Sequence, residues 1–158
     1  MAKFEMKLPQ EIIKDLDLIY KNTDKMLGEM TQAGAEVVVK NIKANAPEGI
    51  RKSAIYKKLK TSKIYKTPTD DGINTKAAFF YGNGDEGYFI NKEGKKTPIP
   101  LVLNMFEYGS SKREYPKHPF IRKSFKKNQI EAAMKKVQKK YLKGTILDNE
   151  WVNWNNIY

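Results

Sequence analysis

The sequence contains no cysteine and only one histidine, His118. Without thiols the chain cannot form disulfides or thiolate metal sites, and a single histidine cannot supply a Cys–His pair or a multi-histidine metal centre. No nucleophile motif accompanies His118 that would place it in a Ser-His-Asp triad. The sequence therefore predicts a non-enzymatic protein that holds no metal and no cofactor.

Long apolar runs are also missing. No stretch approaches the roughly 18 apolar residues of a membrane span. The first thirteen residues lack the continuous apolar segment of a secretory signal. We therefore expect a soluble protein inside a cell, with no membrane partner. The 158 residues, 40% of them hydrophobic, are enough for one folded domain with a single core.

Positive charge, by contrast, is abundant. Thirty Lys and Arg against eighteen Asp and Glu give a formal net charge of +12, which favours contact with phosphates or with an acidic protein. Twenty-seven of the thirty are lysines, which suit non-specific attraction more than bidentate reading of bases. Lys123, Lys126 and Lys127 are candidates for a surface that faces DNA. A small basic nucleic-acid-binding protein stays open as an alternative.

A long amphipathic helix is predicted over residues 9–44. Its apolar stripe recurs at alternating steps of four and three residues, which keeps it on one helical face. The stripe consists of Ile12, Leu16, Ile19, Thr23, Met26, Met30, Ala33 and Val37. Residues 22–24 mark a place for a bend, and Pro47 disfavours a helical residue before it, so the helix should end at about Asn45. The stripe either lies on a sheet or packs in part on a neighbouring subunit.

Short strands are predicted after a helical turn at residues 53–55. Residues 59–65 and 75–81 have β-type patterns on either side of a polar turn, so we expect an antiparallel hairpin. Residues 88–90 form a further candidate strand within the Gly-rich segment 82–100. The glycines of that segment lack the accompanying residues of a phosphate or calcium loop, and a solvated loop is expected. A second helix is predicted over residues 120–143, with Pro119 at its first turn and Gly144 as its stop signal.

These elements predict an α+β fold, with the long N-terminal helix and the C-terminal helix packed on a small antiparallel sheet. Residues 1–144 are expected to form one domain, followed by an aromatic C-terminal tail over residues 145–158. The tail holds both tryptophans, and helical spacing relates Leu147, Trp151, Trp154 and Tyr158. These side chains either close over the domain's own core or anchor in another subunit. Further candidates for contacts between subunits are Tyr88 and Phe89.

Residues 101–125 combine an apolar run, a turn and a basic-aromatic loop. The apolar run is expected to supply one buried element. Gly109 permits a positive φ, so the chain can turn sharply there. Glu107 precedes the turn and is expected to tie it down by accepting hydrogen bonds from backbone donors.

Two short sequence motifs, one at residues 107–122 and one upstream of it at residues 46–50, resemble those of a known family. Glu107-Tyr108-Gly109-Ser110 and Pro119-Phe120-Ile121-Arg122 are similar to the Glu-aromatic-Gly-Thr and Pro-Phe-(Leu or Ile)-Arg marks of tailed-phage tail-completion proteins, which are minor tail or head–tail joining components. The family's second mark, an Ala-Pro followed by Gly after a long helix, is matched by Ala46-Pro47-Glu48-Gly49-Ile50. The chain departs from the pattern at Ser110, where Thr is usual, at Glu48-Gly49-Ile50 in place of Thr-Gly-Leu, and by an apparent insertion between residues 83 and 98.

The resemblance, over about residues 8–142, implies a structural protein of the phage virion. It implies a ring, a hexamer, at the head–tail junction, with the neighbouring neck and tail-tube proteins as partners and genomic DNA passing through the middle. Before assembly the protein would be in the host cytoplasm. A tail terminator and a head-closure ring stay open as related alternatives. The signature residues of both marks are expected to fix the fold, and segments 83–98 and 145–158 to make the contacts between subunits or rings.

Overall fold

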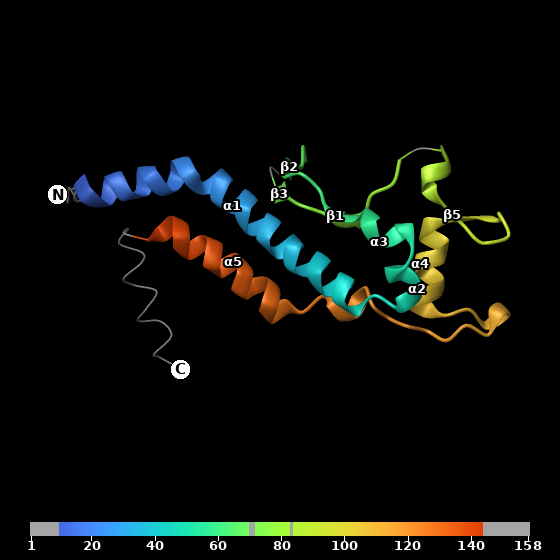
Figure 1. Ribbon diagram of the computed structural model, residues 1–158. Coiled ribbons are helices and arrows are strands. Elements are labelled where there is room, and N and C mark those ends of the chain that lie inside the picture. The colour runs from blue at the N-terminus through green and yellow to red at the C-terminus, as the bar shows by residue number, and fades with distance from the viewer. Residues whose placement is uncertain (1–9, 70–71, 83, 144–158) are drawn as a thin grey trace.

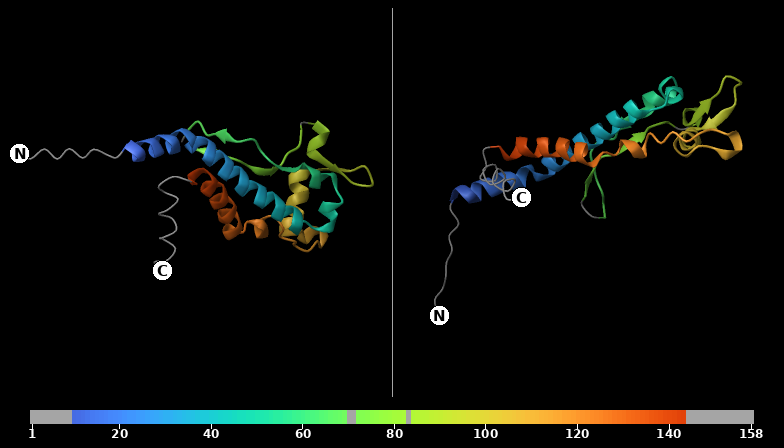
Figure 2. Two further views of the ribbon diagram at one scale, coloured as in Figure 1. Left: turned by 60° about the vertical axis from the view of Figure 1, so that its left-hand side comes forward. Right: turned by 90° about the horizontal axis from the view of Figure 1, so that it is seen from below.

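The computed structural model describes residues 10–69, 72–82 and 84–143, and its dominant element is one helix, α1 (Gln10–Asn45). The helix ends at Asn45, as predicted from Pro47. Figures 1 and 2 show that its axis changes direction in its N-terminal half. In that half Asn22 Nδ2 donates to the Leu18 carbonyl and Thr23 Oγ1 donates to the Ile19 carbonyl. Bonds from a side chain to the carbonyl four residues earlier bend helices, which accounts for the bend in the predicted place.

A second helix, α5 (Lys127–Leu142), runs antiparallel to α1 and lies beside it, and we call this pair the helical arm (Figures 1 and 2). The two helices approach closely at Gly34. A Cβ at that position would lie 3.2 Å from Ile130 Cγ2 and 3.4 Å from Met134 Cγ. Nearer the far end of the arm, the Tyr141 hydroxyl donates to Glu29 Oε1 at 2.6 Å.

The opposite end of the molecule is built from short helices around the end of α1 (Figure 1). They are α2 (Glu48–Arg51), α3 (Ala54–Lys58) and α4 (Ile99–Tyr108). The apolar run predicted as a buried element is α4. Pro98 precedes it and Pro100 lies in its first turn, where a missing N–H is not needed. Its buried residues Ile99, Leu103 and Glu107 recur every four positions, so one face of α4 enters the core.

The strands form three separate antiparallel pairs, each of two strands. β1 (Leu59–Thr61) pairs with β4 (Ala77–Phe79), β2 (Tyr65–Lys66) with β3 (Ile73–Asn74), and β5 (Tyr88–Ile90) with β6 (Lys96–Pro98). The predicted hairpin is therefore present, with Leu59 opposite Phe79. In the described part of the chain the strands make three small sheets where the pattern predicted one. The first predicted strand is interrupted between Thr61 and Tyr65, which separates β1–β4 from β2–β3, and β5 pairs only with β6.

The hydrophobic core lies where the C-terminal half of α1 meets the short helices. Its buried members are Val38, Ile42, Ala46, Ile50, Ile55, Leu59, Ile99, Leu103 and Phe120. The predicted fold class is confirmed: α1 and α5 pack together with small antiparallel sheets in an α+β fold. The boundary of a single domain at residue 144 stays a prediction, and the predicted tail over residues 145–158 lies outside the described residues.

The predicted start of the C-terminal helix is wrong. The helix begins at Lys127, whereas the pattern placed Pro119 and Phe120 in its first turn. Residues 122–124 form only a short 3-10 turn, η3 (Arg122–Ser124), and Phe125 has φ −80° and ψ 78°. The break follows η3, where Phe125 and Lys126 leave the helical backbone region and the Ser124 carbonyl accepts from Asn41 Nδ2 of α1 instead of continuing a helix.

Candidate functional site

The Glu107 carboxylate is the centre of the site. It is 3% exposed and accepts four hydrogen bonds. The N–H groups of Phe120 and Ile121 donate to Oε2, each at 2.9 Å, and the N–H and Nε of Arg122 donate to Oε1 at 3.2 and 3.1 Å. A buried carboxylate is stable only when its oxygens are paired in this way. Glu107 does accept from backbone donors, but these belong to residues 120–122 and not to the adjacent Gly109 turn that it was predicted to tie down.

Tyr108 and Arg122 extend this contact to the surface. The Arg122 guanidinium carbon lies 4.9 Å from the centroid of the Tyr108 ring, a cation–π distance. The Tyr108 side chain is exposed, and Arg122 also forms the ion pair with Glu107. The arginine therefore links the buried carboxylate to an aromatic ring that faces solvent.

Gly109 turns the chain back onto α4. Its φ is 79°, and a Cβ there would lie 2.8 Å from the Tyr115 carbonyl oxygen and 3.0 Å from the Lys117 nitrogen. Ser110 and Tyr115 pair through two backbone bonds of 2.9 Å, and the His118 N–H donates to the Phe106 carbonyl at 2.7 Å. Only glycine fits this turn, as predicted from the sequence.

The two sequence marks meet although about sixty residues separate them. Ala46, Ile50 and Phe120 are each 1% exposed and belong to the same core cluster. A Cβ at Gly49 would lie 3.1 Å from the Phe106 ring, so α2 packs closely on α4. We call the assembly of residues 46–50, α4 and residues 109–122 the junction.

Side chains from α1 hold the η3 turn against this junction. Asn41 Nδ2 donates to the Ser124 carbonyl at 3.1 Å, and Asn45 Nδ2 donates to the Ser124 hydroxyl at 2.9 Å. The Ser124 hydroxyl donates to the Phe120 carbonyl, and Ser124 is fully buried. Sequence reasoning missed these three residues. Polar side chains four positions apart near the end of α1 were the available signal, but their partner lies about eighty residues away.

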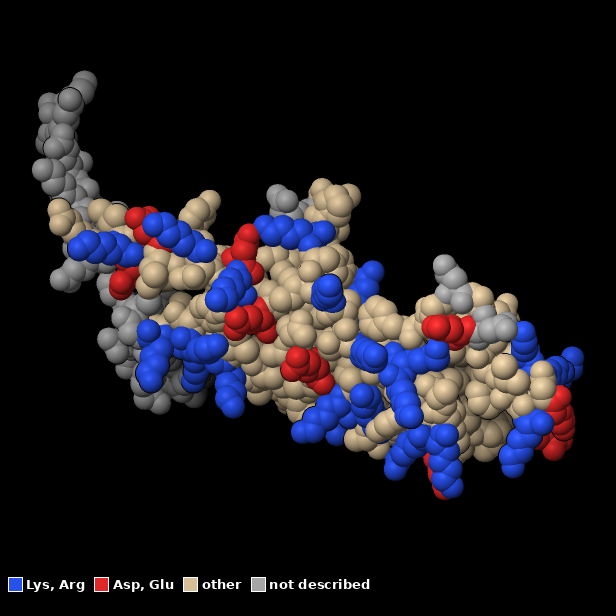
Figure 3. Space-filling model, turned by 45° about the horizontal axis from the view of Figure 1, so that its top comes forward, with Lys and Arg blue, Asp and Glu red and all other residues tan. Residues whose placement is uncertain are grey.

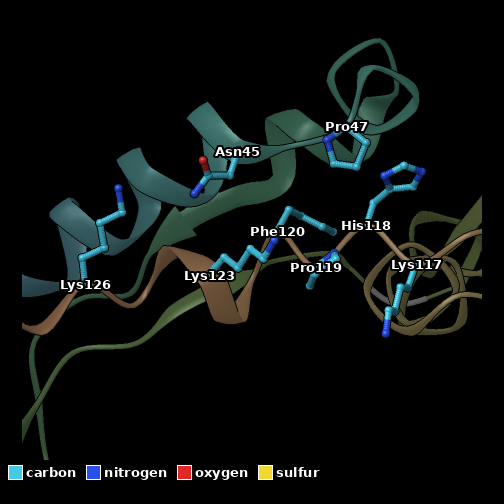
Figure 4. Close-up of a pocket in the computed structure, with 8 residues that line it drawn as sticks. All are labelled: Asn45, Pro47, Lys117, His118, Pro119, Phe120, Lys123 and Lys126. Carbon is cyan, nitrogen blue, oxygen red and sulfur yellow. The ribbon is translucent and has the colours of Figure 1, made fainter.

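A basic hollow of about 510 Å³ opens beside the junction (Figure 4). Figure 4 shows Asn45 and Pro47 on one side of it and the chain from Lys117 to Lys126 on the other. The cationic side chains that line it are Lys117, Lys123 and Lys126, and His118 lines it too. Such a hollow attracts anions, either phosphates or the carboxylates of a protein.

The predicted DNA-facing and interface residues fall in different places. Lys123 and Lys126 line the hollow. Lys127 does not, and its Nζ lies 3.6 Å from Glu131 Oε1, one turn along α5. Tyr88 is exposed and Phe89 is half-buried against the core. Trp151, Trp154 and Tyr158 lie outside the described residues. Lys and Arg side chains are also spread widely over the face in Figure 3, with fewer Asp and Glu among them.

Metal and membrane sites can be judged only within residues 10–69, 72–82 and 84–143. There, no group of three or more His, Cys, Asp or Glu is placed to hold a metal ion. In the same part of the chain no helix is both long and apolar enough to cross a bilayer.

The fold and the junction define a small basic α+β protein with a long N-terminal helix. Residues 10–92 match the family model described as "Bacteriophage HK97-gp10, putative tail-component". Because the match spans more than half of the chain, the protein belongs to this HK97-gp10-like family of phage tail components. The matched span includes Ala46, Pro47 and Gly49 and ends before Glu107. No curated protein and no solved structure matches the chain.

Proposed function

We propose that this protein is a tail-completion protein of the phage head–tail junction, where copies of it form a hexameric ring between the head-side connector and the tail tube. Membership in a family of phage tail components supports a structural role in the virion with other tail proteins as partners. The ring and its position in the neck go beyond family membership and rest on the surfaces described next.

The observation that carries the proposal is the presence of exposed apolar side chains at both ends of an elongated chain (Figure 1). On the helical arm they include Ile13, Leu16 and Tyr20. At the opposite end they include Tyr88, Ile90, Leu101 and Tyr108. Exposed apolar side chains that gather at one end of a molecule are candidates for an interaction site. Two unlike surfaces on opposite ends suit a head-to-tail contact, which closes into a ring when the rotation between subunits permits.

The junction supports the same proposal because it makes the connection between these surfaces rigid. The buried Glu107 carboxylate joins α4 to residues 120–122 by four hydrogen bonds. Asn41 and Asn45 then join that segment to α1.

Deletion of the gene from the phage tests the proposal. We expect filled heads and complete tails that fail to join, counted by electron microscopy, and restoration by the gene supplied in trans. Tails of irregular length would instead support a tail terminator, and heads that lose DNA would support a head-closure ring. Normal, infectious particles without the gene would overturn the proposal.

The basic hollow favours a second candidate, direct contact with DNA. Gel shifts with duplex DNA over a salt series test it, with Lys123→Ala plus Lys126→Ala as the variant. We expect the wild type to bind weakly and without sequence preference. In the variant, the slope of the logarithm of the binding constant against the logarithm of the salt concentration should be smaller in magnitude by about two, since each phosphate contact contributes about 0.9. The control is Lys135→Ala plus Lys136→Ala, which removes the same charge from exposed positions of α5. Tight, sequence-dependent binding by the isolated subunit would favour a nucleic-acid-binding protein over a neck component.

A further inference from the structure

The N-terminal half of α1 carries an apolar face that the described residues leave uncovered. Ile13, Leu16 and Tyr20 recur at steps of three and four, so they lie on one side of the helix. Their exposed fractions are 45%, 53% and 84%. We call these three side chains the arm face. The first residue of α1 that is buried, among those described, is Gly28.

The other helix of the arm ends close to this face along α1, but on a neighbouring side of the helix. Tyr141 and Leu142, the last residues of α5, line a shallow hollow together with Leu18, Ile19, Asn22 and Met26 of α1. The chain therefore leaves α5 within a short distance of the arm face. Figures 1 and 2 show α1 continuing past the end of α5.

The residues that follow α5 have the composition of a segment that packs on such a face. Between residues 144 and 158 the sequence has two Trp, one Tyr, Leu147 and no Lys or Arg. Its two acidic residues, Asp148 and Glu150, follow the lysine-rich end of α5 at Lys139, Lys140 and Lys143. Large aromatic side chains gain the most from burial.

We propose that residues 144–158 pack on the arm face of the same chain. The nine residues of α1 from Gln10 to Leu18 measure about 13 Å at 1.5 Å per residue. The nine steps along the chain from Leu142 to Trp151 span about 13 Å as a helix and up to roughly 30 Å when extended. The segment therefore reaches the whole of the uncovered face.

Residues 144–158 are joined to α5 by the backbone, and this attachment favours them over a second copy of the chain as the segment that covers the arm face. A segment attached next to its site is present there at an effective concentration on the order of millimolar, which a free subunit at micromolar concentration cannot match. In the free subunit the segment thus shields the arm face and competes with any subunit contact made through it. The packing itself does not depend on the proposed ring.

Tryptophan fluorescence reads this contact directly, because both tryptophans of the protein lie in the segment. The variant is Leu16→Lys in the full chain, and the control is Leu101→Lys. The two leucines are 53% and 52% exposed, but Leu101 lies on α4 at the opposite end of the molecule. Emission wavelength and quenching by acrylamide are measured at concentrations where sedimentation shows a monomer.

We expect Leu16→Lys to shift the emission to longer wavelength and to increase quenching, while Leu101→Lys leaves both at the wild-type value. The difference should be independent of protein concentration. No change with Leu16→Lys, an equal change with Leu101→Lys, or a change confined to concentrations at which the protein self-associates would each overturn the proposal.

Engineered cysteines supply a second measurement, because the natural chain has none. Leu16→Cys combined with Trp151→Cys should form a disulfide within one chain, since such bonds need Cα atoms within roughly 7 Å. Leu101→Cys with Trp151→Cys is the control and should stay reduced. A disulfide-linked dimer would overturn the proposal in favour of a second copy on the arm face. The absence of a disulfide within one chain when Leu16→Cys is paired in turn with Leu147→Cys, Trp151→Cys and Trp154→Cys would overturn it outright.

Discussion

The two halves of α1 have the same apolar spacing but different surroundings. In the C-terminal half Val38 and Ile42 are 5% and 3% exposed and belong to the core cluster. In the N-terminal half Ile13 and Leu16 are 45% and 53% exposed. The difference arises because the short helices, Phe120 and most of α5 pack on the C-terminal half, whereas only the last residues of α5 reach the N-terminal half. Periodicity thus specifies a helix and its apolar face, but not how completely that face is covered.

The same contrast separates the junction from the helical arm. The junction combines fully buried side chains with a carboxylate whose oxygens are all paired. The arm is held by a close approach at Gly34 and by polar contacts near its open end. Substitutions in the junction should therefore cost far more stability than substitutions at the open end of the arm.

The largest effect is expected from Phe120→Ala. Phe120 is 1% exposed, and truncating a buried phenylalanine costs about 3–5 kcal/mol through lost burial and the cavity left behind. Phe125→Ala is the matched control, since that ring is 58% exposed, and its cost should be within about 0.5 kcal/mol. Urea unfolding measures both. Equal costs at the two positions would show that the junction is not the centre of stability.

Glu107→Ala should follow, with a loss of about 3 kcal/mol, because it leaves three backbone N–H groups and Arg122 without their acceptor. Glu107→Gln keeps the size but removes the charge, so its loss should be intermediate. Glu131→Ala is the control, an exposed glutamate paired with Lys127, with an expected cost of a few tenths of a kcal/mol. An unfolding midpoint unchanged by Glu107→Ala would refute the role of the carboxylate.

Gly109→Ala tests the turn that closes the junction. Its φ of 79° and ψ of −178° lie in a region that essentially only glycine adopts, which costs other residues about 1–3 kcal/mol. The new Cβ would also collide with the Tyr115 carbonyl. Gly94→Ala is the control, because Gly94 has φ 78° and open space around it. The expected loss of unfolding free energy is larger for Gly109→Ala than for Gly94→Ala. Equal losses would mean that the backbone strain at Gly109 is the whole effect and that the contact with the Tyr115 carbonyl adds nothing.

These positions also mark how far the sequence could predict the structure. The length of α1, its end before Pro47 and the positive φ of Gly109 depend on neighbouring residues, and they were predicted correctly. The start of α5 was predicted wrongly, because the backbone leaves the helical region at Phe125 and Lys126, where Asn41 of α1 bonds the Ser124 carbonyl from about eighty positions away. Helical periodicity contains no information about such a distant donor.

The site was predictable to the same extent. The sequence predicted that Glu107 accepts from backbone donors, but it placed these donors in the adjacent Gly109 turn and not at residues 120–122. The buried Ser124 and its contacts with Asn41 and Asn45 were not, since they join residues about eighty positions apart. The basic hollow is likewise a product of tertiary packing, which brings Lys117, Lys123 and Lys126 around the end of α1.

The smallest effect is expected at the open end of the arm, from Tyr141→Phe. The hydrogen bond that Tyr141 donates to Glu29 raises the pKa of the tyrosine above its ordinary value of 10.0, and partial burial and the charge of Glu29 act in the same direction. Because the folded pKa is raised, the contribution of this bond is complete below pH 10.0 and is lost as pH rises through the folded value.

Thermal unfolding of the wild type and of Tyr141→Phe over this pH range measures the effect. The wild type should be slightly more stable near neutral pH, and the two midpoints should converge above pH 10.0, since the many lysines that titrate there are common to both proteins. Midpoints that coincide across the range would mean that the bond to Glu29 contributes nothing to the arm, and a constant offset would mean that the titration of Tyr141 is not what removes its contribution. A loss as large as that of Phe120→Ala would remove the distinction between arm and junction.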